Sequence, residues 1–156
     1  MTQPTLHSRG EFWVIGQFVL MAVIVVVGLL TQGHYTTGVL NVVVGILLCA
    51  VSLGFGWRGF VNLGKNLTAF PKPLADGQLV TSGVYAIVRH PIYTSVLAGC
   101  FGYALLRASW LAILVSVVLC VWFEFKSRRE EHFLNERFPE YAAYAQSVKK
   151  FIPAIY

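Results

Sequence analysis

Hydrophobic residues are concentrated in four segments of the chain, and short polar breaks separate them. The segments comprise residues 12–30, 39–57, 92–106 and 110–123. The first two contain no charged residue and are long enough, as helices, to cross the ~30 Å hydrocarbon core of a bilayer. The last two would reach only about 20–22 Å at the helical rise, so we expect a short helical hairpin. The pattern predicts an all-α integral membrane protein with about four transmembrane helices.

The polar regions complete a single domain that covers residues 1–156. Its predicted parts are two transmembrane helices in 12–57, a cytoplasmic loop in 58–91, the hairpin in 92–125 and a cytoplasmic tail in 126–156. Ser109, before the fourth segment, is a favoured N-cap residue. In the tail we expect one helix through Phe138 and a second, amphipathic helix from Pro139 that lies on the membrane surface. No small-x-small cleavage site follows the first segment, so we expect a retained helix there and not a signal peptide.

The composition supports a membrane protein, because 56% of the residues are hydrophobic, only 12% are charged and the mean hydropathy is +0.66. The net charge of +5 comes from basic residues in the N-terminal region, the central loop and the tail, with Arg107 alone on the opposite side. By the positive-inside rule, these regions and both termini should be cytoplasmic, and this distribution argues against nucleic-acid binding. The three cysteines and four histidines are scattered, so no metal site is expected.

Residues 54–59 match G-x-G-x-x-G, a pattern that can bind dinucleotides. That motif needs a preceding strand and a βαβ unit around it, whereas here it closes a membrane helix. We interpret these glycines as a helix end and a place of close helix contact, and we expect no Rossmann domain.

The tripeptide Arg89-His90-Pro91 precedes the third apolar segment. Proline is favoured in the first turn of a helix, so Arg89 and His90 would lie at the helix N-terminus. Unpaired backbone N–H groups and the helix dipole favour an anion there, which makes a carboxylate or phosphate site one interpretation. The other is an ordinary positively charged flank with Tyr93 at the membrane interface. The residues alone favour neither.

A polar stripe continues the fourth segment at helical spacing, and it consists of Glu124, Arg128, Glu131 and Asn135. Carboxylates near hydrocarbon are costly and by default are functional or paired. Glu124 and Arg128 could simply form an i,i+4 ion pair. Glu131, with Glu130 beside it, would face the Arg–His site and suit a ligand that carries both an amino group and a carboxylate.

Several short motifs occur in order through the second half of the chain. They are Gly83-x-Tyr85, Arg89-His90-Pro91-x-Tyr93, Glu130-Glu131-x-x-Leu134-x-x-x-Phe138, Glu140-Tyr141-x-x-Tyr144 and Phe151-Ile152-Pro153. With the hydrophobic hairpin between them, they make residues 79–153 resemble the isoprenylcysteine carboxyl methyltransferase family. Phospholipid N-methyltransferases and small prokaryotic membrane methyltransferases share the same core. Val84 and Pro139 depart from the family pattern, which usually has proline and glycine at these positions.

The resemblance implies a membrane methyltransferase that uses S-adenosylmethionine without a Rossmann domain and without a metal. The implied cofactor-binding residues are Tyr85, Arg89, His90, Tyr93, Glu130 and Glu131. The implied catalytic residues are Glu131 and Arg137, with Arg137 orienting the acceptor. That acceptor would be a small lipophilic or lipid-borne carboxylate, thiol, hydroxyl or amine, entering from the membrane lipids at the cytoplasmic face of a prokaryotic inner membrane. The alternative is a non-enzymatic membrane protein, either a transporter or channel subunit or an assembly factor.

Overall fold

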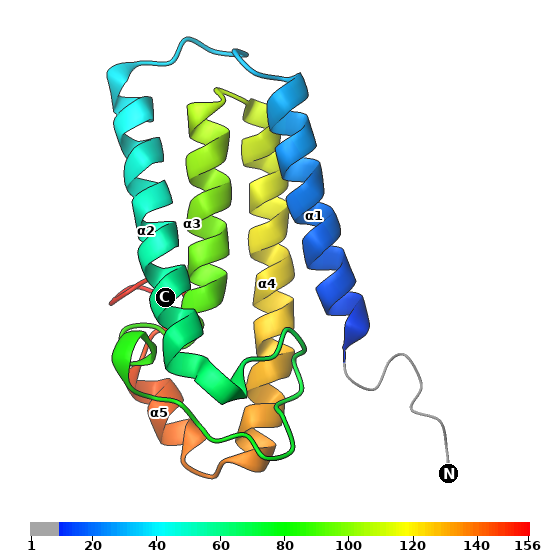
Figure 1. Cartoon of the computed structure of the whole chain (residues 1–156), viewed down its shortest axis with the longest axis vertical. Helices are drawn as coiled ribbons and strands as arrows, with labels where there is room; N and C mark the ends of the chain where they lie inside the picture. The colour runs from blue at the N-terminus through cyan, green and yellow to red at the C-terminus, as the bar shows by residue number, and fades with distance from the viewer. Residues whose placement is uncertain (1–9) are drawn as a thin grey trace.

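The computed structural model describes residues 10–156, so the predicted basic flank at Arg9 lies outside the described residues. Within these residues the regular structure is helical, apart from one isolated bridge between Val88 and Lys149. The elements are α1 (Glu11–Leu30), α2 (Val39–Leu63), η1 (Gly64–Asn66), η2 (Gly83–Ala86), α3 (Pro91–Leu106), α4 (Trp110–Arg137) and α5 (Tyr141–Ser147). In Figure 1, α2 packs beside α3, α3 beside α4 and α4 beside α1. The start of α1 and the end of α4 lie at the same end of this bundle.

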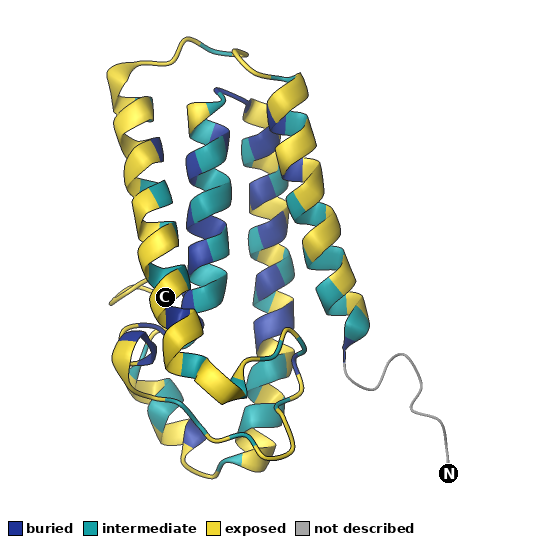
Figure 2. Ribbon diagram, viewed as in Figure 1, coloured by how far each residue is buried: buried dark blue, intermediate teal, exposed yellow. Residues whose placement is uncertain are grey.

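The long helices are suited to a lipid environment. α1, α4 and the segment formed by α2 with η1 are each long and apolar enough to cross a membrane, whereas α3 has only 16 residues, or about 24 Å. Figure 2 shows that buried residues gather on α3 and α4, while α2 is mostly exposed and α1 alternates between exposed and partly buried residues. Large apolar side chains such as Leu30, Val39 and Leu53 account for this exposure, which suits lipid and would be unfavourable in water. These features confirm the predicted all-α membrane fold.

α4 joins the fourth apolar segment to the helix predicted in the tail, and it ends at Arg137, close to the predicted end at Phe138. It runs without a break for 28 residues, so the expected boundary between hairpin and tail at residue 125 lies inside one helix. The helix continues because Lys126 and the residues after it include many good helix formers, with no glycine or proline among them. Its start agrees with the prediction, since Ser109 Oγ accepts a hydrogen bond from Ala112 N–H at 3.1 Å.

α2 extends beyond its predicted end and stops at Leu63, which shortens the predicted loop. The glycines expected to end the helix instead bring it close to α3, because a Cβ on Gly56 would lie 2.6 Å from Ser95 Oγ. On α3, a Cβ on Gly102 would lie 2.8 Å from the backbone oxygen of Gly45. The predicted close helix contact is therefore present, and small residues at the interface allow it.

The last helix, α5, begins at Tyr141 and not at Pro139 as predicted. Phe138 and Pro139 instead belong to a turn in which Tyr141 N–H donates to the Phe138 carbonyl oxygen at 3.0 Å. Glu140 precedes the helix as its N-cap. This turn sends the chain back under the bundle, so that α5 lies near the loop that leads into α3 (Figure 1).

Candidate functional site

A cavity of about 480 Å³ lies at the end of the bundle, where the central loop between α2 and α3 meets α4 and α5. Its volume is in the range of small-molecule sites, about 300–1,000 Å³. His90 and Glu130 line one part of it, which we call the polar end, and Met21 and Val96, further along α1 and α3 into the bundle, line the part that we call the apolar end.

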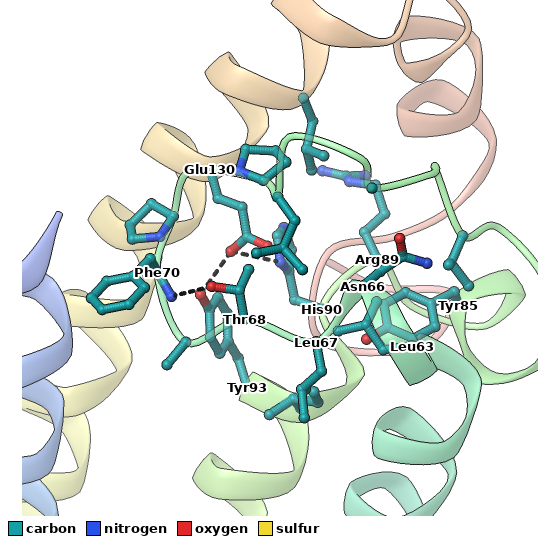
Figure 3. Close-up of a pocket in the computed structure, with 18 of the residues that line it drawn as sticks. Leu63, Asn66, Leu67, Thr68, Phe70, Tyr85, Arg89, His90, Tyr93 and Glu130 are labelled. Atoms are coloured by element: carbon teal, nitrogen blue, oxygen red, sulfur yellow. Dashed lines mark hydrogen bonds and ion pairs between the residues drawn. The ribbon is translucent and has the colours of Figure 1, made fainter. Parts of the chain in front are cut away.

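Three of the predicted cofactor residues meet at the polar end, as Figure 3 shows. The Tyr93 hydroxyl donates to Glu130 Oε2 at 2.7 Å, and His90 Nδ1 lies 3.8 Å from the same oxygen. The His90 and Tyr93 rings are stacked with their centroids 5.3 Å apart. Pro91 begins α3, as predicted, and His90 N–H donates to the Lys150 carbonyl oxygen at 3.1 Å. The tail therefore helps to hold His90 at the cavity.

Glu131 lies behind His90 and is not among the residues that line the cavity. Its Oε1 is 2.9 Å from Arg89 Nη2 and 3.0 Å from His90 Nε2, and the three side chains are only 17%, 11% and 5% exposed. Arg89 also donates to the carbonyl oxygens of Ala145, at 2.9 Å, and Val148. Arg89 and Glu131 thus fix the His90 ring and join the start of α3 to α4 and to the tail.

The predicted polar stripe on α4 is divided among different partners. Glu124 forms the predicted i,i+4 pair with Arg128 at 2.6 Å and a second pair with Lys150 of the tail at 3.1 Å. Lys150 also lies 3.8 Å from Glu131, so it bridges the two carboxylates. Asn135 donates from its side chain to the Glu131 backbone oxygen at 2.9 Å. The stripe mainly fastens the tail to α4.

Tyrosines complete the polar end of the cavity. Tyr85, predicted from the motif, is buried in η2, and the Tyr144 hydroxyl donates to its backbone oxygen. Burial, together with the charge of Glu130, raises the pKa of Tyr85, and burial also raises the pKa of Tyr144 to about 12. Both are therefore neutral at physiological pH. The Tyr141 hydroxyl is buried without a hydrogen-bond partner in residues 10–156, and a ligand in the cavity could supply one.

Arg137, predicted to orient an acceptor, lies at the end of α4 and is not among the cavity-lining residues. Its side chain is exposed and donates to the backbone oxygen of Ala75 in the central loop. In this position Arg137 holds the central loop, which lines the cavity, against α4. Its role towards an acceptor stays a prediction.

Two cavity residues, Lys126 and Tyr141, were not predicted as site residues. Lys126 is 1% exposed, and its sequence signal is weak, because a lone lysine after an apolar run resembles any positive membrane flank. Tyr141 belongs to the tail motif, but its spacing predicted only the apolar face of a surface helix. Burial of a polar group inside a cavity depends on tertiary structure, which neither local pattern reports.

Comparison with known proteins identifies a family and several relatives. Residues 40–141 match the sequence model of the phospholipid methyltransferase family. The nickel-cobalt-cadmium resistance protein NccN of Alcaligenes xylosoxydans xylosoxydans is 28% identical over 97% of this chain and 67% of its own length. The cobalt-zinc-cadmium resistance protein CzcN of Cupriavidus metallidurans is 31% identical over 97% of this chain and 66% of its own length. Protein-S-isoprenylcysteine O-methyltransferase B of Arabidopsis thaliana is 30% identical over 76% of this chain and 58% of its own length.

The region that matches the family runs from α2 to the first residue of α5. It includes the cavity-lining residues Arg89, His90, Tyr93 and Glu130, and also Glu131 behind them. The chain spans between 58% and 67% of the length of the three relatives. The family match, the motifs and the all-α membrane fold together show that the chain belongs to the phospholipid methyltransferase family and is a relative of the isoprenylcysteine carboxyl methyltransferases.

Proposed function

We propose that the chain transfers the methyl group of S-adenosylmethionine to a lipophilic acceptor that reaches the cavity from the bilayer. The observation that carries this proposal is the cavity, which has a polar end at His90 and Glu130 and an apolar end at Met21 and Val96. A polar cofactor and a lipid-soluble acceptor would meet where the two ends join. Membership of a methyltransferase family supports the same chemistry.

The side chains of the polar end fit the amino-acid part of S-adenosylmethionine, which carries an ammonium and a carboxylate. Glu130, oriented by the Tyr93 hydroxyl at 2.7 Å, would accept hydrogen bonds from the ammonium. His90, fixed by Glu131, would donate to the carboxylate, and the unpaired hydroxyl of Tyr141 is a further donor. We therefore assign a direct cofactor role to Glu130 and His90 and a positioning role to Glu131.

The protein would contribute mainly positioning and the exclusion of water. When bound, S-adenosylmethionine supplies a methyl group that is already activated by its sulfonium charge. Glu131 and Arg89 hold the His90 ring, and the central loop, fastened by Arg137, covers one side of the cavity. An ionised acceptor needs no base, whereas for an amine acceptor Glu130 is a cavity carboxylate that could take the proton.

The names of the relatives bear on the acceptor. The Arabidopsis protein is named for S-isoprenylcysteine, a lipid-bearing group, which supports a lipophilic acceptor for this chain as well. The two resistance proteins are named for metals, but residues 10–156 contain no group of three His, Cys, Asp or Glu side chains arranged to hold a metal ion. We therefore extend only the methyltransferase chemistry to this chain, with the cavity facing the cytoplasmic side of a prokaryotic inner membrane.

Calorimetric titration of the purified chain in detergent with S-adenosylhomocysteine tests the proposal. We expect the wild type to bind it and His90→Ala to bind about tenfold or more weakly, because a lost charge-assisted hydrogen bond costs about 1.5–3 kcal/mol. His132→Ala is the matched control, since His132 is exposed on α4 and pairs with the exposed Glu136. Absence of binding by the wild type would contradict the proposal and favour the non-enzymatic alternative. Equal binding by both variants would remove His90 from the site.

A further inference from the structure

A buried lysine, Lys126, lies next to Tyr93 in the lining of the cavity. It follows the apolar part of α4, lines the cavity and is 1% exposed. Its amino group donates to the Ala69 backbone oxygen at 3.0 Å and to the Gln17 side chain, and it lies 5.0 Å from the centroid of the Tyr93 ring. An ammonium at this depth in a membrane protein is costly, and by default it serves a function or is paired with an opposite charge.

Other buried cations of the site have such a partner. Arg89 pairs with Glu131, and Lys150 pairs with Glu124. Lys126 has no carboxylate oxygen within 4.0 Å among residues 10–156, and both of its hydrogen-bond acceptors are neutral. Because an ammonium has three N–H donors, one remains for a group inside the cavity. The charge of Glu130, one turn further along α4, acts on Lys126 without a direct contact, so an anion in the cavity could take the remaining donor.

We propose that Lys126 binds the anionic group of the methyl acceptor, so that the acceptor reacts as a carboxylate, thiolate or phenolate and not as an amine. This inference rests on the proposed function. The apolar part of the acceptor would lie along Phe18, Met21 and Val96, which line the apolar end. An ammonium next to these side chains attracts an anionic head group and repels a cationic one, and so selects between two lipids with the same tail.

The arrangement favours a transfer that needs no base. A lone pair of the acceptor anion forms the new bond to the methyl carbon, while the carbon–sulfur bond breaks and its electron pair stays on sulfur. The positive charge of the sulfonium and the negative charge of the acceptor both disappear, which gives S-adenosylhomocysteine and a neutral methyl ester, thioether or ether. Because this neutral product no longer attracts Lys126, its return to the bilayer is favoured.

Binding of a fatty acid and a fatty amine of equal chain length tests the assignment. Each would be titrated into the full chain in nanodiscs, with S-adenosylhomocysteine present at saturation. We expect the wild type to prefer the fatty acid, and Lys126→Met to lose about tenfold or more in fatty-acid affinity while its S-adenosylhomocysteine affinity changes by less than about twofold. Lys126→Arg should keep the preference. Arg129→Met, which removes an exposed positive charge from the same helix, is the control and should bind like the wild type.

Three results would overturn the inference. They are an unchanged fatty-acid affinity in Lys126→Met, a parallel loss of S-adenosylhomocysteine affinity in that variant, and a wild-type chain that binds both lipids equally or prefers the amine. A wild type that fails to bind S-adenosylhomocysteine would instead overturn the proposed function.

A second variant decides the matter if Lys126→Met does not fold. Gln17→Met removes a neutral partner of Lys126 and leaves the ammonium in place with one more free donor. If Lys126 binds an anion, the ratio of fatty-acid to fatty-amine affinity should rise in this variant. If that ratio is unchanged or lower, Lys126 serves only to tether α4 to α1, and the inference is wrong.

Discussion

Replacement of Glu131 by glutamine should destabilise the protein, because Glu131 is the anion for several buried groups. Its Oε1 is 2.9 Å from Arg89 Nη2 and 3.0 Å from His90 Nε2, and its Oε2 is 3.8 Å from Lys150 Nζ. The Glu131 side chain is 17% exposed, so water can replace it only in part. Glutamine has nearly the same shape, but it carries no charge, and its NH₂ group cannot accept a hydrogen bond from these donors.

The size of the effect follows from the charge that is left without a partner. Removal of one member of a buried ion pair costs about 3–5 kcal/mol, and the amide oxygen that remains can recover about 0.5–1.5 kcal/mol as a hydrogen-bond acceptor. We therefore expect Glu131→Gln to lower the free energy of unfolding by about 2–4 kcal/mol. Binding of S-adenosylhomocysteine should weaken as well, because the His90 ring loses the group that holds it.

Equilibrium unfolding in mixed detergent micelles, followed by circular dichroism, measures this change. Glu136→Gln is the matched control on the same helix, because Glu136 is 60% exposed and its partner His132 is 69% exposed. That control should change the free energy of unfolding by no more than about 0.5 kcal/mol. If the two variants are equally stable, the reasoning that Glu131 joins the start of α3 to α4 is refuted.

Two further predictions concern the packing and the orientation of the bundle. Gly102→Ala should lower stability by about 1–3 kcal/mol, because the new Cβ would lie 2.8 Å from the Gly45 backbone oxygen. Thermal unfolding in detergent measures this, with Gly54→Ala, which has open space around its Cβ, as the control, and equal stability of the two variants would contradict close α2–α3 packing. Reporters at the two chain ends should both be accessible from the cytoplasmic side, and accessibility from opposite sides would contradict the orientation.

The helices and their starting points were largely predictable, because they depend on neighbouring residues. Uncharged apolar runs predicted α1 and most of α2, while Pro91 and Ser109 predicted where α3 and α4 begin. The pair between Glu124 and Arg128 likewise follows from helical spacing. The end of α2 was misplaced because hydropathy reports where the hydrocarbon ends, whereas a helix continues as long as its backbone hydrogen bonds do.

The inner arrangement of the site was less predictable. The motifs indicated both Glu130 and Glu131, yet Glu130 lines the cavity and Glu131 lies behind it, because adjacent residues on a helix point about 100° apart. The pairing of Lys150 with Glu124 and the contact of Lys126 with Gln17 join distant parts of the chain. A single sequence carries no pattern that reports such long-range contacts.

Transfer of a labelled methyl group tests the central claim most directly. The purified chain in nanodiscs would be incubated with S-adenosylmethionine labelled on its methyl group and with a lipid extract from the membranes of the organism that makes the protein. The label in the organic-soluble fraction would then be measured. Our account predicts transfer by the wild type, a large loss in His90→Ala and Glu130→Gln, and normal transfer by Glu140→Gln, whose side chain is exposed. No label above that of heat-denatured protein, or equal label in all the variants, would contradict it.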